Sequence, residues 1–393
     1  LSDAEGSIEG LERFDSPGKG RGLRVTRPFK LGELLFSSPA YSYVLSVKER
    51  GCLCEFCFTR KEGLARCGKC KKAFYCNVKC QKGDWAMHKL ECSAMTAFGE
   101  KWCPSEMARL VARILAKKKV QKERCVSEKI LLLGEMQSHV EDVDNEKREM
   151  NEADIAGLYQ FYSKHLDMPD HKDLLTLFSQ VACNGFTIED DELSHMGTAV
   201  YPDVALINHS CLPSVIVTYN GTSAEVRAVQ DMKPGDEVLI SYIDLLYPTD
   251  DRNNRLRESY YFTCDCQECK SKSKVRSSQS DPIEPEVINN MVRYARKTIR
   301  EFRASKNLLE MCEQNIDGAI RYGEKILKPY NRLYPPYSLN VSSMYLKLGR
   351  LYMGMERHSM GISAFKKALA IMEVAHGKDH SYLVELRKEM AQK

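Results

Sequence analysis

Cysteine and histidine pairs at metal-ligand spacing are the clearest chemical signal in the sequence. Residues 50–95 hold eight of the sixteen cysteines and one histidine close to them. The pairs are Cys54-x2-Cys57, Cys67-x2-Cys70, Cys76-x3-Cys80 and His88-x3-Cys92. Thiolate and imidazole groups at such spacings are typical of structural zinc sites, and each such site takes four ligands. The eight ligands therefore predict two closed tetrahedral sites.

The order of these pairs favours an interleaved arrangement. Residues four apart share one face of a helix, so we expect the last two pairs to be helical and the first two to be loops. The predicted sites are Cys54, Cys57, Cys76 and Cys80 for one zinc, and Cys67, Cys70, His88 and Cys92 for the other. The alternative is a set of reduced cysteines in a packed core. A fragment of about 45 residues gains most of its folding energy from such metals.

A third cysteine cluster lies further along the chain. Cys264-x-Cys266-x2-Cys269 offers three ligands, one fewer than a closed site needs. Cys211 is the best candidate for the fourth ligand, because the other free cysteines lie in helical or linker contexts. The alternative is a loose reduced cluster. We therefore expect three zinc ions per chain, with Cys52 excluded from them.

Composition limits the classes of protein that the sequence can encode. The chain has 393 residues, of which 43% are hydrophobic and 28% charged, as in a globular protein of two or three domains and unlike collagen, coiled coils or disordered chains. No apolar run reaches the roughly 18 residues of a membrane span, and acidic residues occupy the start, so we expect an intracellular protein. Eleven thiolates and three Zn²⁺ ions would change the formal charge of +4 to about −1, which argues against a strongly basic nucleic-acid-binding protein.

The residue composition and hydrophobic periodicity change along the chain and predict an α+β fold. Short apolar runs and glycines in residues 1–48 and 181–243 indicate strands and turns. Helical periodicity over residues 105–178 predicts an all-helical insertion between them. A Ser/Lys-rich stretch over residues 270–281 predicts an exposed linker, and everything after it is predicted to be helical.

Two further patterns concern a hairpin and the helical tail. Asn220-Gly221 is expected to form the two-residue turn of a hairpin. The tail has a tetratricopeptide-like pattern of small and aromatic residues. Its members are Tyr345, Leu348, Gly349, Tyr352, Gly361, Phe365 and Ala368. An earlier second helix at 318–327 lacks its expected partner, so we expect a missing segment near Asn315.

Four motifs in a fixed order carry a family resemblance. They are Gly18-Lys19-Gly20-Arg21-Gly22-Leu23, then Asn208-His209-Ser210-Cys211-x-Pro213, then Gly235-Asp236-Glu237-Val238 running to Ser241-Tyr242, then the cysteine triplet. In this order they resemble a SET-domain protein lysine methyltransferase. The first zinc-binding segment resembles the MYND finger, a protein-interaction module, with Trp85 and His88 at that family's aromatic and histidine positions. Nearly the whole chain thus resembles the SET and MYND domain family, although Ser214 stands where the family usually has asparagine.

The resemblance implies a division of the chain. The expected parts are 1–49, the N-terminal part of the SET domain; 50–95, the MYND zinc finger; 96–180, a helical SET insertion; 181–248, the core SET domain; 249–271, a post-SET zinc segment; and 272–393, a tetratricopeptide-like helical domain. The expected fold is a SET-domain β-fold split by the finger and the insertion and followed by the all-α domain.

The resemblance also implies a cofactor, S-adenosylmethionine, and the residues that hold it. These residues are Lys19, Gly20, Arg21, His139, Asn208, His209 and Tyr260. The alternatives are ordinary surface charges for Lys19 and Arg21 and packed histidines for His139 and His209. Because methyl transfer to a neutral amine depends mainly on alignment, an aromatic channel is the expected lining. Phe186, Tyr242 and Tyr260 are its predicted catalytic residues, with Tyr242 closest to the chemistry.

The expected function is methylation of lysine in histone, including histone H3, and non-histone proteins. Peptide partners are expected at the finger and at the helical tail, with weak nucleic-acid contact possible electrostatically at the finger, where Lys and Arg outnumber acids. We expect no membrane association, a monomer, and a location in the cytoplasm and nucleus. Two rival hypotheses are a non-enzymatic adaptor with a vestigial SET fold and a zinc-dependent DNA-binding protein.

Overall fold

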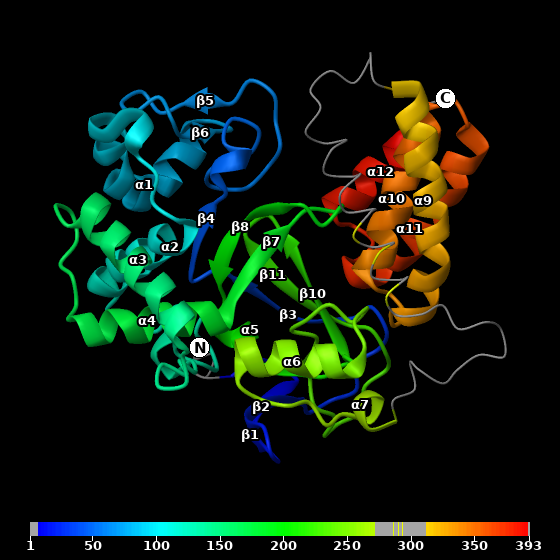
Figure 1. Cartoon of the computed structure of the whole chain (residues 1–393), viewed down its shortest axis with the longest axis horizontal. Helices are drawn as coiled ribbons and strands as arrows, with labels where there is room; N and C mark the ends of the chain where they lie inside the picture. Colours follow the sequence, from blue (N-terminus) through cyan, green and yellow to red (C-terminus); the bar gives the residue numbers. More distant parts are fainter. Residues whose placement is uncertain (1–6, 272–285, 287–289, 291–292, 294–311, 392–393) are drawn as a thin grey trace.

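The computed structural model describes residues 7–271, 286, 290, 293 and 312–391 (Figure 1). Small β-sheets lie in the middle of the molecule, with the finger and the helical insertion on one side and the helical tail on the other (Figure 1). The fold is α+β, as predicted. None of the helices that the structure describes is both long and apolar enough to cross a membrane.

The central sheets are built from strands far apart in sequence. In one sheet, β1 (Leu11–Ser16) pairs with β2 (Gly20–Val25). A second sheet has the order β10 (Val215–Asn220), β11 (Ser223–Ala228), β3 (Leu34–Pro39), and a third has the order β4 (Ser42–Leu45), β8 (His195–Val200), β7 (Gly185–Glu189). All pairs in these three sheets are antiparallel. Apolar side chains such as Leu23, Val44 and Val226 are fully buried beneath them. The N-terminal and central parts of the chain therefore form one core.

The hairpin between β10 and β11 turns one residue later than predicted. Asn220 pairs with Ser223, so the two turn residues are Gly221 and Thr222. Gly221 has a φ of +60°, as expected of glycine at the first central position of a type II′ turn. The prediction that Asn220-Gly221 forms the turn was wrong, because a single glycine at the first position already supplies the required conformation.

A short parallel pair brings two distant motifs together. β9 (Asn208–His209) pairs with β12 (Leu239–Ile240), and the Ser210 N–H donates to the Ile240 carbonyl at 2.9 Å. The buried Ser214 hydroxyl donates to the Glu237 carbonyl at 3.1 Å and accepts from the Leu239 N–H at 2.9 Å. The Ser214 hydroxyl therefore bonds both the Glu237 carbonyl and the Leu239 N–H at the start of β12. The pairing of β9 with β12 places Asn208 and His209 beside Tyr242.

The finger and the insertion follow β4. The η1 turn (Val47–Glu49) precedes the finger, which contains β5 (Ala65–Arg66), β6 (Phe74–Tyr75) and α1 (Val78–Phe98). The insertion contains η2 (Gly99–Lys101), α2 (Glu106–Val120), η3 (Leu133–Glu135), α3 (Asn145–Tyr162) and α4 (His171–Asn184). Ser105, Asp144 and Asp170 begin their helices by accepting a main-chain N–H with their side chains. Residues 121–144 contain only the short η3 turn, so the prediction of an all-helical insertion was wrong there.

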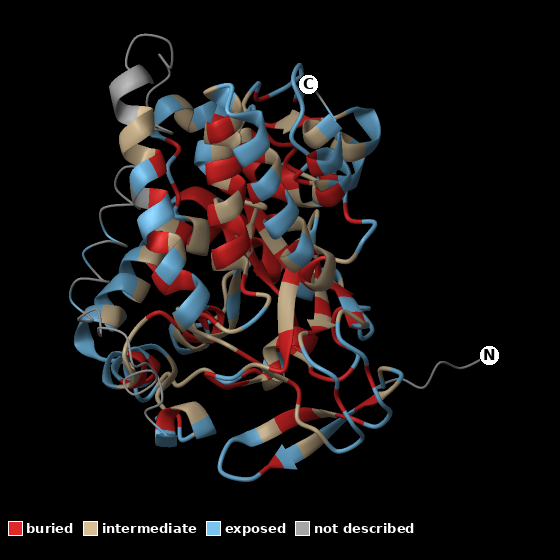
Figure 2. Cartoon of the chain, turned by 90° about the vertical axis from the view of Figure 1, so that its right-hand side faces the viewer, coloured by how far each residue is buried: buried red, intermediate tan, exposed pale blue. Residues whose placement is uncertain are grey.

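The remaining helices within the described residues frame the site and form the tail. They are α5 (Pro202–Ala205), α6 (Thr249–Tyr260), α7 (Gln267–Ser271), α9 (Cys312–Leu333), α10 (Leu339–Gly354), α11 (His358–Ala375) and α12 (Ser381–Ala391). A Cβ on Gly349 would lie 2.4 Å from the Phe365 ring, so α10 and α11 pack closely where the repeat pattern predicts a small residue. The Thr218 hydroxyl donates to the Ala375 carbonyl at 3.2 Å, which docks the tail on β10. Figure 2 shows buried residues on the inward faces of these helices.

The predicted linker falls almost wholly outside the described residues, as does most of the segment before Asn315. Asn315 itself lies within α9. The missing segment near it is therefore a prediction that these helices do not test.

Candidate active site and zinc centres

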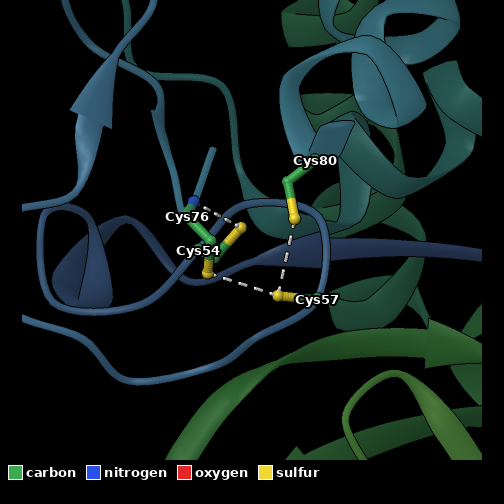
Figure 3. Close-up of side chains that lie close together, drawn as sticks. All are labelled: Cys54, Cys57, Cys76 and Cys80. Atoms are coloured by element: carbon green, nitrogen blue, oxygen red, sulfur yellow. Dashed lines mark hydrogen bonds between the residues drawn. The ribbon is translucent and has the colours of Figure 1, made fainter. Parts of the chain in front are cut away.

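The three predicted ligand sets come together in the structure. In each set all four ligand atoms lie within 4.8 Å of one another: Cys54, Cys57, Cys76 and Cys80; Cys67, Cys70, His88 and Cys92; Cys211, Cys264, Cys266 and Cys269. In the first set the Cys57 sulfur lies 3.7 Å from that of Cys76 and 3.9 Å from that of Cys80 (Figure 3). Zinc–sulfur bonds of about 2.3 Å in a tetrahedron put the sulfurs about 3.8 Å apart, so these groups fit Zn²⁺. The structure brings the predicted ligands together in the interleaved grouping.

One local detail differs from the prediction. Cys76 precedes α1, because Asn77 begins the helix and its side chain accepts the Cys80 N–H at 3.0 Å. Cys76 therefore reaches the zinc from the end of β6, while Cys80, His88 and Cys92 reach theirs from the helix. The Cys76–Cys80 pair spans the helix start and is not helical throughout.

A buried ionic cluster joins the finger to the insertion. Glu91 on α1 lies between the ligands His88 and Cys92 in sequence, and its carboxylate accepts from Arg109 at 2.9 Å and from Arg113 at 3.3 Å. Both arginines come from α2, and Arg109 also donates to the Leu45 carbonyl at 2.7 Å. Burial alone would raise the pKa of Glu91, but the two guanidinium groups hold it well below its usual range. The cluster therefore remains ionised and fixes the finger against β4 of the central sheets.

The third metal set has its own buried cation. The Arg252 guanidinium, fully buried on α6, lies 3.3 Å from the Cys211 sulfur and 3.6 Å from the Cys269 sulfur. Four thiolates around Zn²⁺ carry a net charge of −2, so a buried donor beside two of them is strongly favourable. Sequence reasoning missed Arg252, because no local pattern marks an arginine 41 residues from Cys211 as its partner.

A cavity of about 360 Å³ lies beside this third set. It is lined by all but two of the predicted cofactor and catalytic residues, namely Lys19, Arg21, His139, Asn208, His209, Tyr242 and Tyr260. Gly20 lies between two of the lining residues, and a Cβ there would meet nothing within 4 Å. Phe186 lies elsewhere and lines a second cavity. The structure thus brings most of the predicted site to one place.

Glu237 organises the polar side of the first cavity. Its carboxylate pairs with the Lys19 ammonium at 3.2 Å and accepts from the Asn208 amide at 2.9 Å. The same amide group donates to the Arg21 carbonyl at 3.0 Å. Glu237 belongs to a motif that the sequence singled out, but its role in the site was not predicted. It holds Asn208 and Lys19 in fixed positions.

His209 connects the third metal set to Tyr242. Its Nδ1 atom accepts the Tyr242 main-chain N–H at 3.0 Å, so its proton resides on Nε2, which lies 3.5 Å from the Cys211 sulfur. Burial lowers the pKa of His209 to about 4, which makes the ring neutral at pH 7. A neutral histidine therefore spans the distance between a metal ligand and the cavity wall.

Tyr242 lies where the two cavities meet. It lines the first cavity and also a second one of about 870 Å³ between strands β7 and β10 and the tail. Its ring centre lies 4.8 Å from that of Tyr260, and its hydroxyl donates to the Ile207 carbonyl at 2.6 Å. Burial raises its pKa well above the usual value, so the phenol stays protonated. Phe186 lines the second cavity, edge-on to Tyr201 at 5.7 Å.

A stacked pair of rings forms part of the lining of the first cavity. The His139 and Tyr261 rings are stacked 4.8 Å apart, and the Lys147 ammonium lies 5.2 Å from the centre of the Tyr261 ring. His139 and Tyr261 have φ angles of +49° and +63°, which is uncommon for residues other than glycine. The insertion and the segment after α6 therefore meet over the cavity.

Comparison with known proteins identifies a matching family model and relatives of this chain. Residues 54–92 match the MYND finger family model. The chain is 61% identical to the N-lysine methyltransferase SMYD2-B of Danio rerio, covering 99% of each chain, and 58% identical to the N-lysine methyltransferase SMYD2 of Homo sapiens, covering 98% of this chain and 99% of the relative. The first alignment runs over 432 positions, more than the 393 residues of the chain, so that relative contains residues that the chain lacks.

Proposed function

Because the chain belongs to the SMYD2 family of N-lysine methyltransferases, we propose that it transfers a methyl group from S-adenosylmethionine to lysine side chains of histone, including histone H3, and non-histone proteins. The observation that carries the proposal is the position of Tyr242, which lines both the cavity beside the third metal set and the cavity beside the tail. One cavity takes the methyl donor and the other takes the protein that receives the methyl group.

The chemistry of the first cavity suits S-adenosylmethionine. Arg21, together with Lys19 beside its partner Glu237, offers positive charge for a carboxylate. The Asn208 side-chain oxygen can accept a hydrogen bond while its amide donors hold Glu237 and the Arg21 carbonyl, and Tyr260 and Phe262 offer apolar faces for a flat ring. When bound, the cofactor supplies a methyl group on a positively charged sulfur. The open space at Gly20 leaves room for a ligand against the main chain.

The residues at the junction favour a neutral lysine amine. A lysine ammonium has a reference pKa of about 10.4, and removal from water lowers that value. The half-buried rings of Tyr242 and Tyr260 exclude water at this point. The hydroxyl of Tyr242 and the carbonyl of Ile207, held together at 2.6 Å, are polar groups that can orient the amine. Alignment of this kind provides effective concentration without any covalent intermediate.

The second cavity suits an extended peptide. Its walls come from the SET strands and from the tail, including Tyr330, Tyr334 and Lys347. The Tyr334 hydroxyl donates to the Asp244 carboxylate at 2.6 Å, which joins the two walls. We propose that the tail limits which proteins reach Tyr242. Peptide binding by the finger is also proposed, supported by Trp85, which is 44% exposed on α1. We further propose a monomer acting in the cytoplasm and nucleus.

Labelled cofactor and a protein panel test the proposal directly. The protein is incubated with methyl-labelled S-adenosylmethionine, histone H3 and a set of lysine-bearing proteins, and the modified residues are located by mass spectrometry. We expect label on lysine, dependent on Tyr242. A protein that binds the cofactor but labels nothing in the panel would favour the adaptor hypothesis, and one that binds no cofactor would refute the proposal.

A further inference from the structure

Asp203 is a buried carboxylate that the proposed chemistry does not use. Its Oδ2 atom accepts the Lys129 N–H at 2.9 Å, and its Oδ1 atom accepts the N–H groups of Ile130 at 2.8 Å and Leu131 at 3.1 Å. The side chain is 1% exposed. Three successive main-chain N–H groups around one anion form a typical anion-binding concavity. A carboxylate this deeply buried is costly unless it is fully hydrogen-bonded, so these three bonds strongly favour one position of residues 129–131.

The segment that Asp203 holds leads into a wall of the first cavity. Residues 121–144 have little regular structure, yet Leu131, Met136, Gln137 and His139 line that cavity. Main-chain groups further along the segment are also tied down. The Gln180 amide donates to the Met136 carbonyl at 2.9 Å, and the Asn184 amide donates to the Gln137 carbonyl at 2.8 Å. These later contacts come from the insertion itself, through α4.

The contact at the start of the segment comes from the SET core. Asp203 lies on α5, five residues before Asn208, which lines the opposite part of the same cavity. The carboxylate therefore joins the insertion to the motif that carries Asn208 and His209. Arg13 on β1 also contacts this segment, donating to the Ile130 carbonyl at 3.2 Å and pairing with Glu135 at 3.1 Å. Without Asp203, residues 129–131 would lose the three hydrogen bonds that hold their main-chain N–H groups against α5, and the spacing between the two walls would be less closely fixed.

We propose that Asp203 is a positioning residue that sets the width of the first cavity by fixing residues 129–131 against the SET core. The inference rests on the proposed function, in which this cavity takes S-adenosylmethionine. Asp203 affects cofactor binding and not the transfer step, because it supports the wall of the first cavity and does not line it, whereas Tyr242 lines both cavities. Its loss therefore weakens cofactor binding and leaves the transfer rate at saturating cofactor nearly unchanged.

Asp203→Asn is the decisive variant, because it preserves the shape of the side chain. Asparagine offers one acceptor oxygen, and its NH₂ group would face main-chain N–H donors. We expect binding of S-adenosylhomocysteine, measured by calorimetry, to weaken about 10- to 100-fold, as for loss of hydrogen bonds to a charged group. The KM for the cofactor should rise in parallel, with kcat within about threefold of the wild-type value.

Asp190→Asn provides a matched control. The Asp190 carboxylate also accepts main-chain N–H groups, from Glu192 at 3.0 Å and Ser194 at 2.8 Å. It lies in the β7–β8 turn, and none of residues 190–194 lines the first cavity, whereas Leu131, which Asp203 holds, does. This variant should bind S-adenosylhomocysteine as the wild type does. An Asp203→Asn protein that folds and binds within twofold of the wild type would overturn the inference, as would equal losses in the two variants.

Amide hydrogen exchange in the cofactor-free protein supplies a readout that does not depend on activity or on the variant folding. In the wild type, the amides of residues 129–131 should be protected although they lie outside any helix or strand. Exchange at the rate of an exposed loop would overturn the inference. In Asp203→Asn these amides should lose protection while those of α2 keep it. If the wild type binds no S-adenosylhomocysteine, the proposed function fails, and exchange alone decides whether Asp203 anchors the segment.

Discussion

The finger's two metal sets and the third set use the same ligand chemistry but are surrounded by different partners. Behind the finger, Glu91 meets Arg109 and Arg113 in a buried ionic cluster that leads toward β4 and away from the cavity. Behind the third set, Arg252 donates to the thiolates and His209 leads to Tyr242. The role of a structural zinc is therefore set by the groups behind its ligands. The finger sets fix a module, whereas the third set fixes the proposed active site.

Removing one ligand from each region should give the largest contrast. Cys266→Ser should abolish measurable binding of S-adenosylhomocysteine, because the third set holds Cys211 next to His209 and Cys264 next to the cavity wall. Structural zinc contributes about 10 kcal/mol or more to folding in small zinc fingers. Cys54→Ser should lose zinc but bind the cofactor product within a few-fold of wild type. Elemental analysis measures the zinc content, with three zinc ions expected in the wild type, and calorimetry measures the affinity for S-adenosylhomocysteine. Equal losses of affinity would break the comparison.

Glu91→Gln should separate stability from cofactor binding. Removing one partner of a fully buried charge cluster leaves Arg109 and Arg113 without their shared anion, which costs about 3–5 kcal/mol of stability. Denaturant unfolding should show this loss, while S-adenosylhomocysteine affinity in the folded protein stays near the wild-type value. A large loss of affinity would show that the finger region also shapes the cavity.

Tyr242→Phe should lower turnover and leave stability almost unchanged. The hydroxyl is lost but the ring stays, so folding and cofactor affinity should change little. Turnover should fall roughly 10²- to 10³-fold, or about 2.7–4 kcal/mol, by analogy with removal of one preorganised polar group from an active site. Single-turnover methylation of a lysine substrate measures it. Near wild-type turnover would move the role to Tyr260, whose ring lies 4.8 Å away.

Arg252→Gln should give the smallest effect in the series. The variant keeps a donor near the Cys211 sulfur but removes the positive charge that balances the thiolates. Loss of such a partner typically costs 10- to 100-fold in metal affinity, so zinc should leave more readily in a chelator titration, with cofactor affinity falling in step. Zinc release from the finger should not change, and a uniform change at all three sites would contradict the proposed independence.

The sequence predicted these metal sites far better than it predicted their surroundings. Ligand pairs such as Cys54 and Cys57 are close in sequence, so their spacing alone reports a shared metal. Arg252, Glu237 and Asp203 act across long stretches of chain through single buried contacts, and no periodicity marks them. Residues 121–144 were predicted as helical from the periodicity of the whole block 105–178; the structure instead holds them through carboxylates such as Asp203. Lys19, Asn208 and Tyr242 were predicted from ordered motifs and line the first cavity, whereas Gly20 and Phe186 do not.

The meeting of two cavities at Tyr242 has a kinetic consequence. The first cavity is lined by the insertion, by the segment after α6 and by motif residues such as Asn208, and the second by strands β7 and β10 and the tail. The proposed donor and acceptor therefore occupy separate cavities. Spent donor could then be exchanged for fresh donor while the acceptor peptide stays in place, so binding in either order and successive transfers to one lysine during a single encounter are expected.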